Sequence, residues 1–309
     1  MIEYFYKTTK DESFIPIPSA KDGCWIHLEE ALAADLDQVG QLIGLEYSDL
    51  QDSLDRYEIP RIENIKNNVL IFSRCPIELD NAVGLYTETL TMIVTPCYFI
   101  TISPQKNNIL RGFLNKPNNN LATTQRSKLV IHLCMRVIQD LTMQIRKVRY
   151  YVLMQEKEII SVDSEDITIL TRQEEILNQY LSSLEPMELV LKDLPSGKYI
   201  PLQDKDQALL EDVFHSLKQS QTICEIALKS IRSLRDSYQI IFTNNLHKTI
   251  KLLTALTIIF NIPTIVSSVY GMNVALPFAE SIHAFAIILS LIFGFSLLFL
   301  WFFKRKMWL

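Results

Sequence analysis

The sequence lacks the patterns that mark enzymes, zinc proteins and disulfide-bonded domains. Its five cysteines are scattered, and none stands at a CxxC or Cys/His spacing, so neither a zinc site nor a disulfide framework is expected. The phosphate-loop, zinc-protease and esterase patterns GxxxxGK[ST], HExxH and GxSxG do not occur. Ser196-Gly197-Lys198 lacks the upstream glycine of a phosphate loop. We therefore expect no enzyme activity, no catalytic residue and no organic cofactor.

The sequence also shows no basic excess, and its first residues do not predict a signal peptide. The formal net charge of the chain is −5, which argues against a nucleic-acid partner. The first residues, MIEYFYKTTKDESF, have neither the basic start nor the apolar core of a signal peptide. Most of the chain is therefore expected to lie in the cytosol.

Charge is absent from two long segments near the C-terminal end. No Asp, Glu, Lys or Arg occurs from Leu252 to Ala279 or from Ile282 to Phe303. Each run is about the ~20 residues that an α-helix needs to cross ~30 Å of hydrocarbon. One such run also fits a buried helix of a soluble core, but two in succession favour two membrane spans.

Basic residues indicate how these spans are oriented. Lys248 and Lys251 precede the first span, and Lys304, Arg305 and Lys306 follow the second. The connection between the spans carries no Lys or Arg, and its one acidic residue is Glu280. The positive-inside rule then places both termini in the cytosol and the connection outside the plasma membrane.

The two predicted spans differ in polarity. The second is uniformly apolar and suits a lipid-facing helix, whereas the first carries polar residues at helical spacing. They are Thr254, Thr257, Asn261, Thr264 and Ser268. Such a stripe fits hydrogen bonding between helices or the wall of a wet pore, and a pore would require several chains. A third interpretation, spans that merely anchor a non-transporting sensor or scaffold, leaves the stripe unexplained.

A long helix is expected before the first span. No Gly or Pro occurs between Pro201 and Pro263, and apolar residues recur there at threes and fours. At ~1.5 Å per residue this predicts a rod of roughly 90 Å that runs into the first span.

The N-terminal part is predicted to be an α/β domain. Strands are expected at 24–28, 69–72, 85–94 and 98–103, helices at 29–54, 127–162 and 165–194, and a loop at 107–124. The whole chain is then an α+β membrane protein with six predicted parts. They are a cytosolic domain (1–200), a stalk helix (201–251), transmembrane helix 1 (252–273), an external loop (274–281), transmembrane helix 2 (282–303) and a basic cytosolic tail (304–309).

Tyr270-Gly271-Met272-Asn273, at the outer end of the first span, resembles the signature of the CorA family of divalent-cation channels. The surroundings are similar too: Ile262-Pro263-Thr264 upstream, a short acidic loop, and the basic tail from Lys304 to Leu309. In the N-terminal domain, Trp25–Glu29 and Arg61-Ile62-Glu63 also resemble family patterns.

The resemblance implies a homopentamer with a funnel-shaped cytosolic domain and a pore made of five copies of the first span. Gly271, Met272 and Asn273 would form the selectivity filter, where a ring of Asn273 amide oxygens receives hydrated Mg²⁺. Gly271 would let the helix end tightly. The alternative for Asn273 is a simple helix cap.

Other positions are assigned by the same resemblance. Thr264 and Asn261 would line the pore, and Leu253 and Ile250 would form a hydrophobic gate. His247 stands where the family often has asparagine, so a titratable ring there implies either pH-sensitive conduction or a different ion. Glu280 would concentrate cations at the outer mouth.

The resemblance also implies regulation by intracellular Mg²⁺ and a choice of cargo. Asp212 matches an acidic sensor position, and its partner is expected at Asp80 or Glu78. The expected activity is Mg²⁺ influx, with Co²⁺ and Ni²⁺ as further cargo, driven by about 2.3 kcal/mol per charge per 100 mV of membrane potential. The alternative within the family is a zinc transporter similar to ZntB, against which Met272 argues mildly.

Overall fold

A computed structural model describes residues 1–77, 86–115, 121–157, 162–197, 199–274, 277 and 282–306. The chain divides into two compact units. The first contains Met1–Ile159 and Thr168–Leu234, and the second contains Ile160–Ile167 and Arg235–Leu309.

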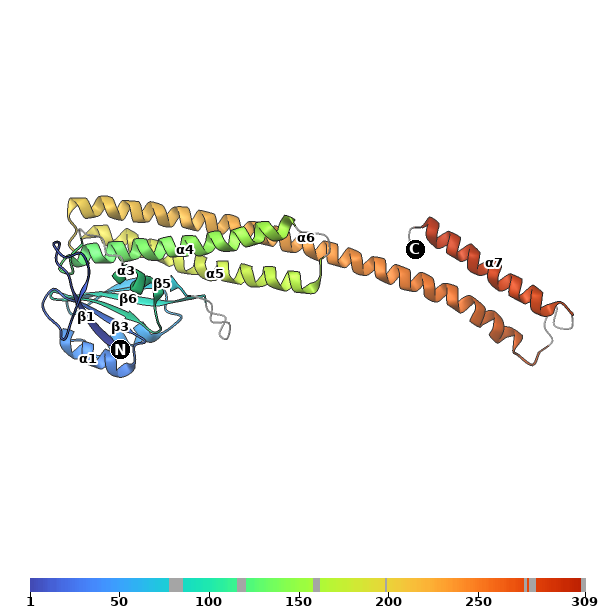
Figure 1. The fold of residues 1–309 in the computed structure, drawn as a ribbon, viewed down its shortest axis with the longest axis horizontal. Coiled ribbons are helices and arrows are strands. Elements are labelled where there is room, and N and C mark those ends of the chain that lie inside the picture. Colours follow the sequence, from blue (N-terminus) through green and yellow to red (C-terminus); the bar gives the residue numbers. More distant parts are fainter. Residues whose placement is uncertain are drawn as a thin grey trace. The chain divides into compact units, whose positions relative to one another are not determined.

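The first unit is built on a seven-stranded sheet with the strand order β2-β1-β3-β7-β6-β5-β4 (Figure 1). Neighbouring strands are antiparallel except for β3 and β7, which are parallel. The strands are β1 (Ile2–Tyr6), β2 (Ile15–Ile17), β3 (Trp25–Glu29), β4 (Arg61–Ile65), β5 (Asn68–Pro76), β6 (Thr87–Val94) and β7 (Phe99–Ser103). Every residue of β3, β6 and β7 is buried, so both faces of the middle of the sheet are covered.

Helices cover both faces of this sheet. On one face, Leu36 and Val39 of α1 pack in a core with Ile26, Leu70 and Phe72. On the other face, α4 contacts β5 and β6. The helical elements before α6, which belong to the first unit except for the start of α5, are α1 (Ala33–Ile43), α2 (Tyr47–Leu50), η1 (Gln51–Leu54), α3 (Asn108–Asn115), α4 (Arg126–Lys157), α5 (Ser164–Asp193) and η2 (Leu194–Ser196).

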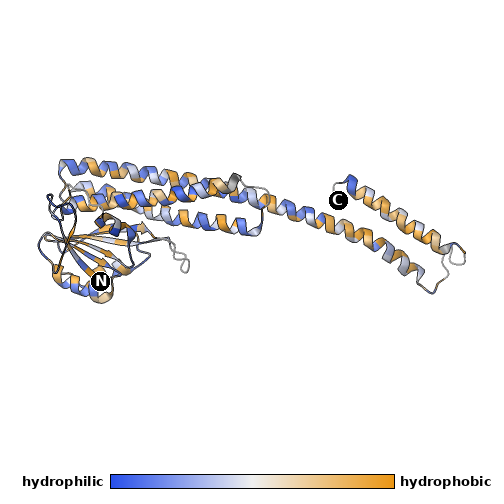
Figure 2. Cartoon of the chain, viewed as in Figure 1, coloured by the Kyte–Doolittle hydropathy of each residue, from blue (hydrophilic) through white to orange (hydrophobic). Residues whose placement is uncertain are grey.

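One helix, α6 (Asp204–Tyr270), runs unbroken for 67 residues, and α7 (Ala284–Arg305) follows it. The expected continuous helix is therefore confirmed. The C-terminal part of α6 and most of α7 are apolar (Figure 2). Both helices are long and apolar enough to cross a membrane, and almost nothing in their most apolar stretches is buried by the described part of the chain. A core helix of a soluble protein would be covered, so exposure favours the membrane interpretation.

The predicted elements are partly confirmed. Strands appear near 24–28, 69–72, 85–94 and 98–103, and the two long helices appear as α4 and α5. The predicted loop 107–124 was wrong in its first half, because Asn107 Oδ1 accepts hydrogen bonds from the N–H groups of Ile109 and Leu110 and starts α3. The predicted helix 29–54 is interrupted at Gly44, which adopts a left-handed φ of 72°. Strands β1, β2 and β4 were not predicted.

Gly40 has a measurable packing role in α1. A Cβ atom added at Gly40 would lie 2.6 Å from the backbone oxygen of Leu45, whereas one added at Gly112 in α3 would meet only Arg136 Nη2, at 3.8 Å. We expect Gly40→Ala to destabilise the protein by about 1–3 kcal/mol. The matched control Gly112→Ala should be neutral or stabilise it by up to ~1 kcal/mol, because alanine favours the helix. Thermal unfolding of the purified protein, followed by circular dichroism, tests this; equal melting temperatures for the two variants would contradict it.

Candidate functional site

The predicted pore residues share one face of α6. On a helix of about 3.6 residues per turn, His247, Leu253, Asn261 and Thr264 all lie within about 60° of Ile250. All five side chains are exposed, with 50% of Ile250 and 63% of Leu253 accessible. Thr254, Thr257 and Ser268 lie on the same face and are also exposed. We call this face of α6 the polar stripe, with Ile250 and Leu253 as its apolar members.

The opposite face of α6 is the better covered one. Ala255 is fully buried, and Ile259, Ile262, Val266 and Tyr270 are half-buried. These residues lie about 120–200° away from Ile250 around the helix. The second unit therefore covers an apolar side of α6 and leaves the polar stripe open, which is the reverse of what burial in lipid alone favours.

Two threonines of the polar stripe donate their hydroxyl hydrogens to backbone oxygens of the same helix. Thr257 Oγ1 donates to Leu253 O at 2.8 Å, and Thr264 Oγ1 donates to Phe260 O at 3.2 Å. Such bonds to the preceding turn satisfy the hydroxyl hydrogen. The oxygen lone pairs remain available, so the stripe offers acceptors to a cation or to the water around it.

Helix α6 ends where the signature begins. The N–H of Gly271 donates to Ser267 O at 3.0 Å, and the N–H of Met272 donates to Val269 O at 3.2 Å, so the last turn tightens. Beyond it, Tyr270 Oη donates to Pro277 O at 3.2 Å.

The role expected for Gly271 needs correction. It does not adopt the left-handed conformation seen at Gly23, Gly44 and Gly197, so special backbone freedom does not end the helix. A Cβ atom there would lie 3.4 Å from Ser267 O, which is an ordinary contact. Nothing within the described part of one chain therefore demands glycine at this position.

Asn273 is exposed, and no hydrogen bond joins its side chain to the end of α6 among the described residues. The cap interpretation has no contact to support it there. The role of Asn273 in a filter stays a prediction, as do the roles of Met272 and His247.

The structure describes only one of the residues that were assigned to regulation and to the external loop. Asp212 lies exposed on α6. Its predicted partners Asp80 and Glu78, and the external residue Glu280, lie outside the described residues. These assignments stay predictions.

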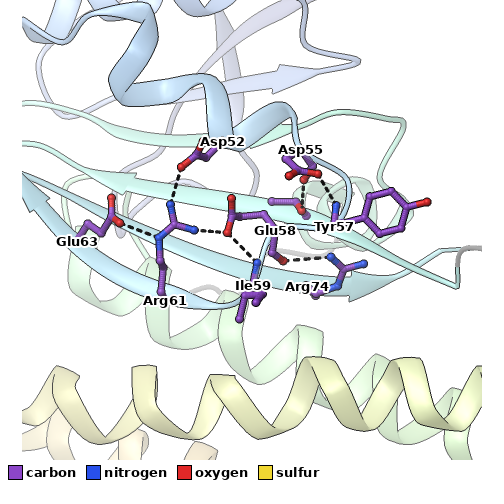
Figure 3. Close-up of polar contacts among 9 residues, drawn as sticks. Asp52, Asp55, Tyr57, Glu58, Ile59, Arg61, Glu63 and Arg74 are labelled. Carbon is purple, nitrogen blue, oxygen red and sulfur yellow. Dashed lines mark hydrogen bonds and ion pairs between the residues drawn. The ribbon is translucent and has the colours of Figure 1, made fainter.

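An acidic cluster that was not predicted from the sequence surrounds Arg61 (Figure 3). Its guanidinium lies 2.7 Å from Asp52 Oδ2 and 2.7 Å from Glu63 Oε1, and it also pairs with Glu58. The same group stacks over the Phe72 ring, 4.1 Å from its centroid. Arg61-Ile62-Glu63 was noted only as a family pattern, because the sequence gives no sign that η1 brings Asp52 back to β4.

The charge of this cluster is only partly balanced. Burial alone would lower the pKa of Arg61, but its hydrogen bond to Glu63 and the charges of Glu63 and Glu58 raise it overall. Three carboxylates around one guanidinium leave two negative charges. Within the described part of the chain, no group of three His, Cys, Asp or Glu side chains is arranged to hold a metal ion. Arg61 instead occupies the centre of the cluster.

Comparison with known proteins identifies relatives over nearly the whole chain. The family described as "CorA-like Mg2+ transporter protein" matches residues 20–305. The cobalt/magnesium transport protein CorA of Methanocaldococcus jannaschii is 23% identical over 301 residues, covering 92% of this chain and 91% of the relative.

Solved structures share the fold. The complete structure of the CorA magnesium transporter from Methanocaldococcus jannaschii matches with a TM-score of 0.76 and 20% identity, covering 100% of this chain and 99% of that one. The ZntB cytoplasmic domain from Vibrio parahaemolyticus matches with a TM-score of 0.62 and 11% identity, covering 77% of this chain and 96% of that one. The ZntB domain is thus the more distant of the two.

Removal of the Arg61 guanidinium should destabilise the first unit. Arg61→Met leaves three neighbouring carboxylates without their shared cation, and we expect a loss of about 1–2 kcal/mol, since the cluster is partly exposed. The matched control is Lys66→Met, which removes one exposed pair with Asp49 at 3.8 Å and should change almost nothing. Melting temperatures at low and high salt test this, and an Arg61 variant as stable as the control would refute it.

Proposed function

The chain belongs to the family of CorA-like Mg²⁺ transporter proteins, and we propose that it forms a channel through which Mg²⁺ enters the cell. The observation that carries this proposal is the polar stripe on α6. It lies exposed on a helix that is itself long and apolar enough to cross a membrane. Polar groups in hydrocarbon are costly unless water or a partner satisfies them, and a water-filled path supplies both.

We propose that the path forms between copies of this chain. Two helices per chain cannot enclose a pore, so the stripe must face other copies of α6, and the family resemblance suggests five. Gly271 supports close packing of copies. No contact within the described part of one chain requires a glycine at this position, so the space left by the absent side chain is available to a neighbouring copy. Under the positive-inside rule both termini lie in the cytoplasm, with Lys248, Lys251, Lys304 and Arg305 at the inner face.

Selection of the ion is assigned to the end of α6. A ring of Asn273 amide oxygens, flanked by Gly271 and Met272, would receive Mg²⁺ with its water shell, because Mg²⁺ dehydrates reluctantly. Neutral dipoles attract the ion weakly enough to release it, whereas a carboxylate ring would hold it longer. Glu280 would raise the local cation concentration. Thr264 and Asn261 then offer further acceptors along the stripe, and Co²⁺ and Ni²⁺ would pass by the same route.

Control of the flow is assigned to the inner half of the stripe. Exposed Leu253 and Ile250 would form a ring that closes by losing water, and His247 would stand at the cytoplasmic entrance. Regulation by cytosolic Mg²⁺ would act through Asp212, with Asp80 or Glu78 as its partner. Inward flux needs no nucleotide, because the membrane potential supplies about 4.6 kcal/mol per divalent ion at 100 mV.

The filter assignment is tested by Mg²⁺ uptake into liposomes held at a negative internal potential. Asn273→Ala should reduce uptake roughly tenfold or more, which corresponds to about 1.4 kcal/mol or more lost at the filter. The matched control is Asn244→Ala, an exposed asparagine about 120° away from Ile250 around α6, which should conduct like the wild type.

The oligomer of each variant is checked by gel filtration before flux is compared. Equal uptake by Asn273→Ala and wild type would move selectivity away from this position. Absence of Mg²⁺ flux in the wild type, together with Zn²⁺ flux under a proton gradient, would replace the Mg²⁺ proposal by zinc transport.

The gate assignment makes a separate prediction. Leu253→Ser should raise Mg²⁺ uptake several-fold under conditions that close the channel, because a polar ring keeps the constriction wet. Leu252→Ser is the matched control, since Leu252 is exposed too but lies about 160° from Ile250. A similar increase in both variants, or none in Leu253→Ser, would exclude Leu253 as the gate.

A further inference from the structure

The first unit contains a small polar cavity between the sheet and α4. Its volume is about 170 Å³, and it lies beside the end of β5 and the start of α3. Glu88 of β6 lines one side, and Asp140 and Gln144 of α4 line the other. Lys106 and Arg136 also contribute to the lining, and their side chains are exposed.

Glu88 is buried without a counter-charge. None of its surface is accessible, and its Oε1 accepts only a long hydrogen bond of 3.4 Å from Ser103 Oγ. Its other oxygen, Oε2, is buried and has no hydrogen-bond partner among the residues that the structure describes. Within the same residues no Lys, Arg or His forms an ion pair with Glu88. Burying an ionised carboxylate without a counter-charge or hydrogen bonds costs free energy. The surroundings of Glu88 therefore lack a positively charged or hydrogen-bonding partner for its ionised form.

The positive charges near Glu88 do not offset the effect of burial on its carboxyl group. Burial raises the pKa of Glu88 to about 7, and the Ser103 hydrogen bond and the charges of Arg56 and Arg74 lower it only in part. Arg74 is itself nearly buried, but it donates to Thr87 and to the backbone of Glu58 instead of to this carboxylate.

Asp140 faces the same cavity from α4 and is also short of positive charge. Only 9% of its surface is exposed, and its partner Arg136 lies 3.2 Å away, with a side chain that is largely exposed. Burial raises the pKa of Asp140 even though Arg136 lowers it. Two carboxylates and two basic side chains, Lys106 and Arg136, therefore line one cavity, and among the described residues only Arg136 forms an ion pair with one of the carboxylates.

We propose that this cavity binds a hydrated divalent cation, Mg²⁺ in the cell, through the carboxylates of Glu88 and Asp140. Mg²⁺ usually keeps several waters and is held by one or two carboxylates, which is what this cavity offers. A water needs about 10–15 Å³ of such space, so 170 Å³ holds an ion with several of its waters. The amide of Gln144 lies at the same wall to hold those waters.

The walls of the site are pre-arranged by bonds that do not involve the ion. Asn107 Oδ1 accepts from Ile109 and Leu110, while its Nδ2 donates to Cys75 Sγ at 3.0 Å. The backbone of Asn107 donates to Glu29 Oε1, which in turn pairs with Arg111. The amide of Asn107 is therefore occupied, and the two carboxylates are left as the ligands. A bound cation would join β6 to α4 within one chain.

Counting bound metal ions tests this site. Full-length protein in detergent is titrated with Mn²⁺ at about pH 8, where a carboxyl with a pKa near 7 is ionised, and free Mn²⁺ is measured by electron paramagnetic resonance. Glu88→Gln should bind one Mn²⁺ fewer per chain than the wild type, and Asp140→Asn should show the same loss. The matched control Glu225→Gln, an exposed acid on α6, should bind as many ions as the wild type. Mg²⁺ should compete for the lost site.

Two outcomes would overturn the proposal. One is an unchanged Mn²⁺ count in both cavity variants, which would mean that the cavity holds only water and a neutral Glu88. The other is a wild-type crystal soaked in Mn²⁺ that shows no anomalous peak between Glu88 and Asp140; this measurement needs no variant to fold. Because both readouts measure binding and not flux, they stand or fall separately from the channel proposal.

Discussion

The structure depends on one constraint: polar groups on a membrane helix must be satisfied by something other than lipid. Helix α6 meets part of this demand internally, since Thr257 and Thr264 donate to backbone oxygens one turn back. Their remaining lone pairs, and the carboxamide of Asn261, still face outward. The proposed water-filled path between several chains would satisfy them, and it would also explain why the covered face of α6 is the apolar one.

The same constraint acts inside the first unit in a different form. The middle strands are buried on both faces, so each polar side chain there needs a partner. Trp25 Nε1 and His27 Nδ1 both bond to Thr101 Oγ1, and Arg74 bonds to Thr87. Among the described residues, His27 Nε2, Thr91 Oγ1 and Glu88 Oε2 have no such partner, and of these three side chains only the carboxyl of Glu88 lines the polar cavity beside α4. A carboxylate binds a cation where a neutral hydroxyl does not, so the proposed ion site is placed at Glu88 and not at Thr91.

The sequence was informative where periodicity is long and composition is extreme. Sixty residues without Gly or Pro predicted α6, and the uncharged runs predicted both apolar helices. It was less informative for short elements. The strand β2 has three residues, two of them exposed, so no alternation marks it. The helix α3 has apolar residues at helical spacing and a side-chain cap at Asn107, but with only eight residues it is too short for its periodicity to stand out.

The sequence by itself determined the two apolar helices, the polar stripe on the first of them and the family, because each depends on residues close together in the chain. Tertiary structure decided that Arg61 would form ion pairs with Asp52, Glu58 and Glu63, since η1 and β4 meet only after the chain turns back. It also decided that Glu88 and Asp140 would share a cavity. Glu88 and Asp140 are far apart in sequence, and their charges matter because packing of α4 on the sheet removes the water that would otherwise solvate them.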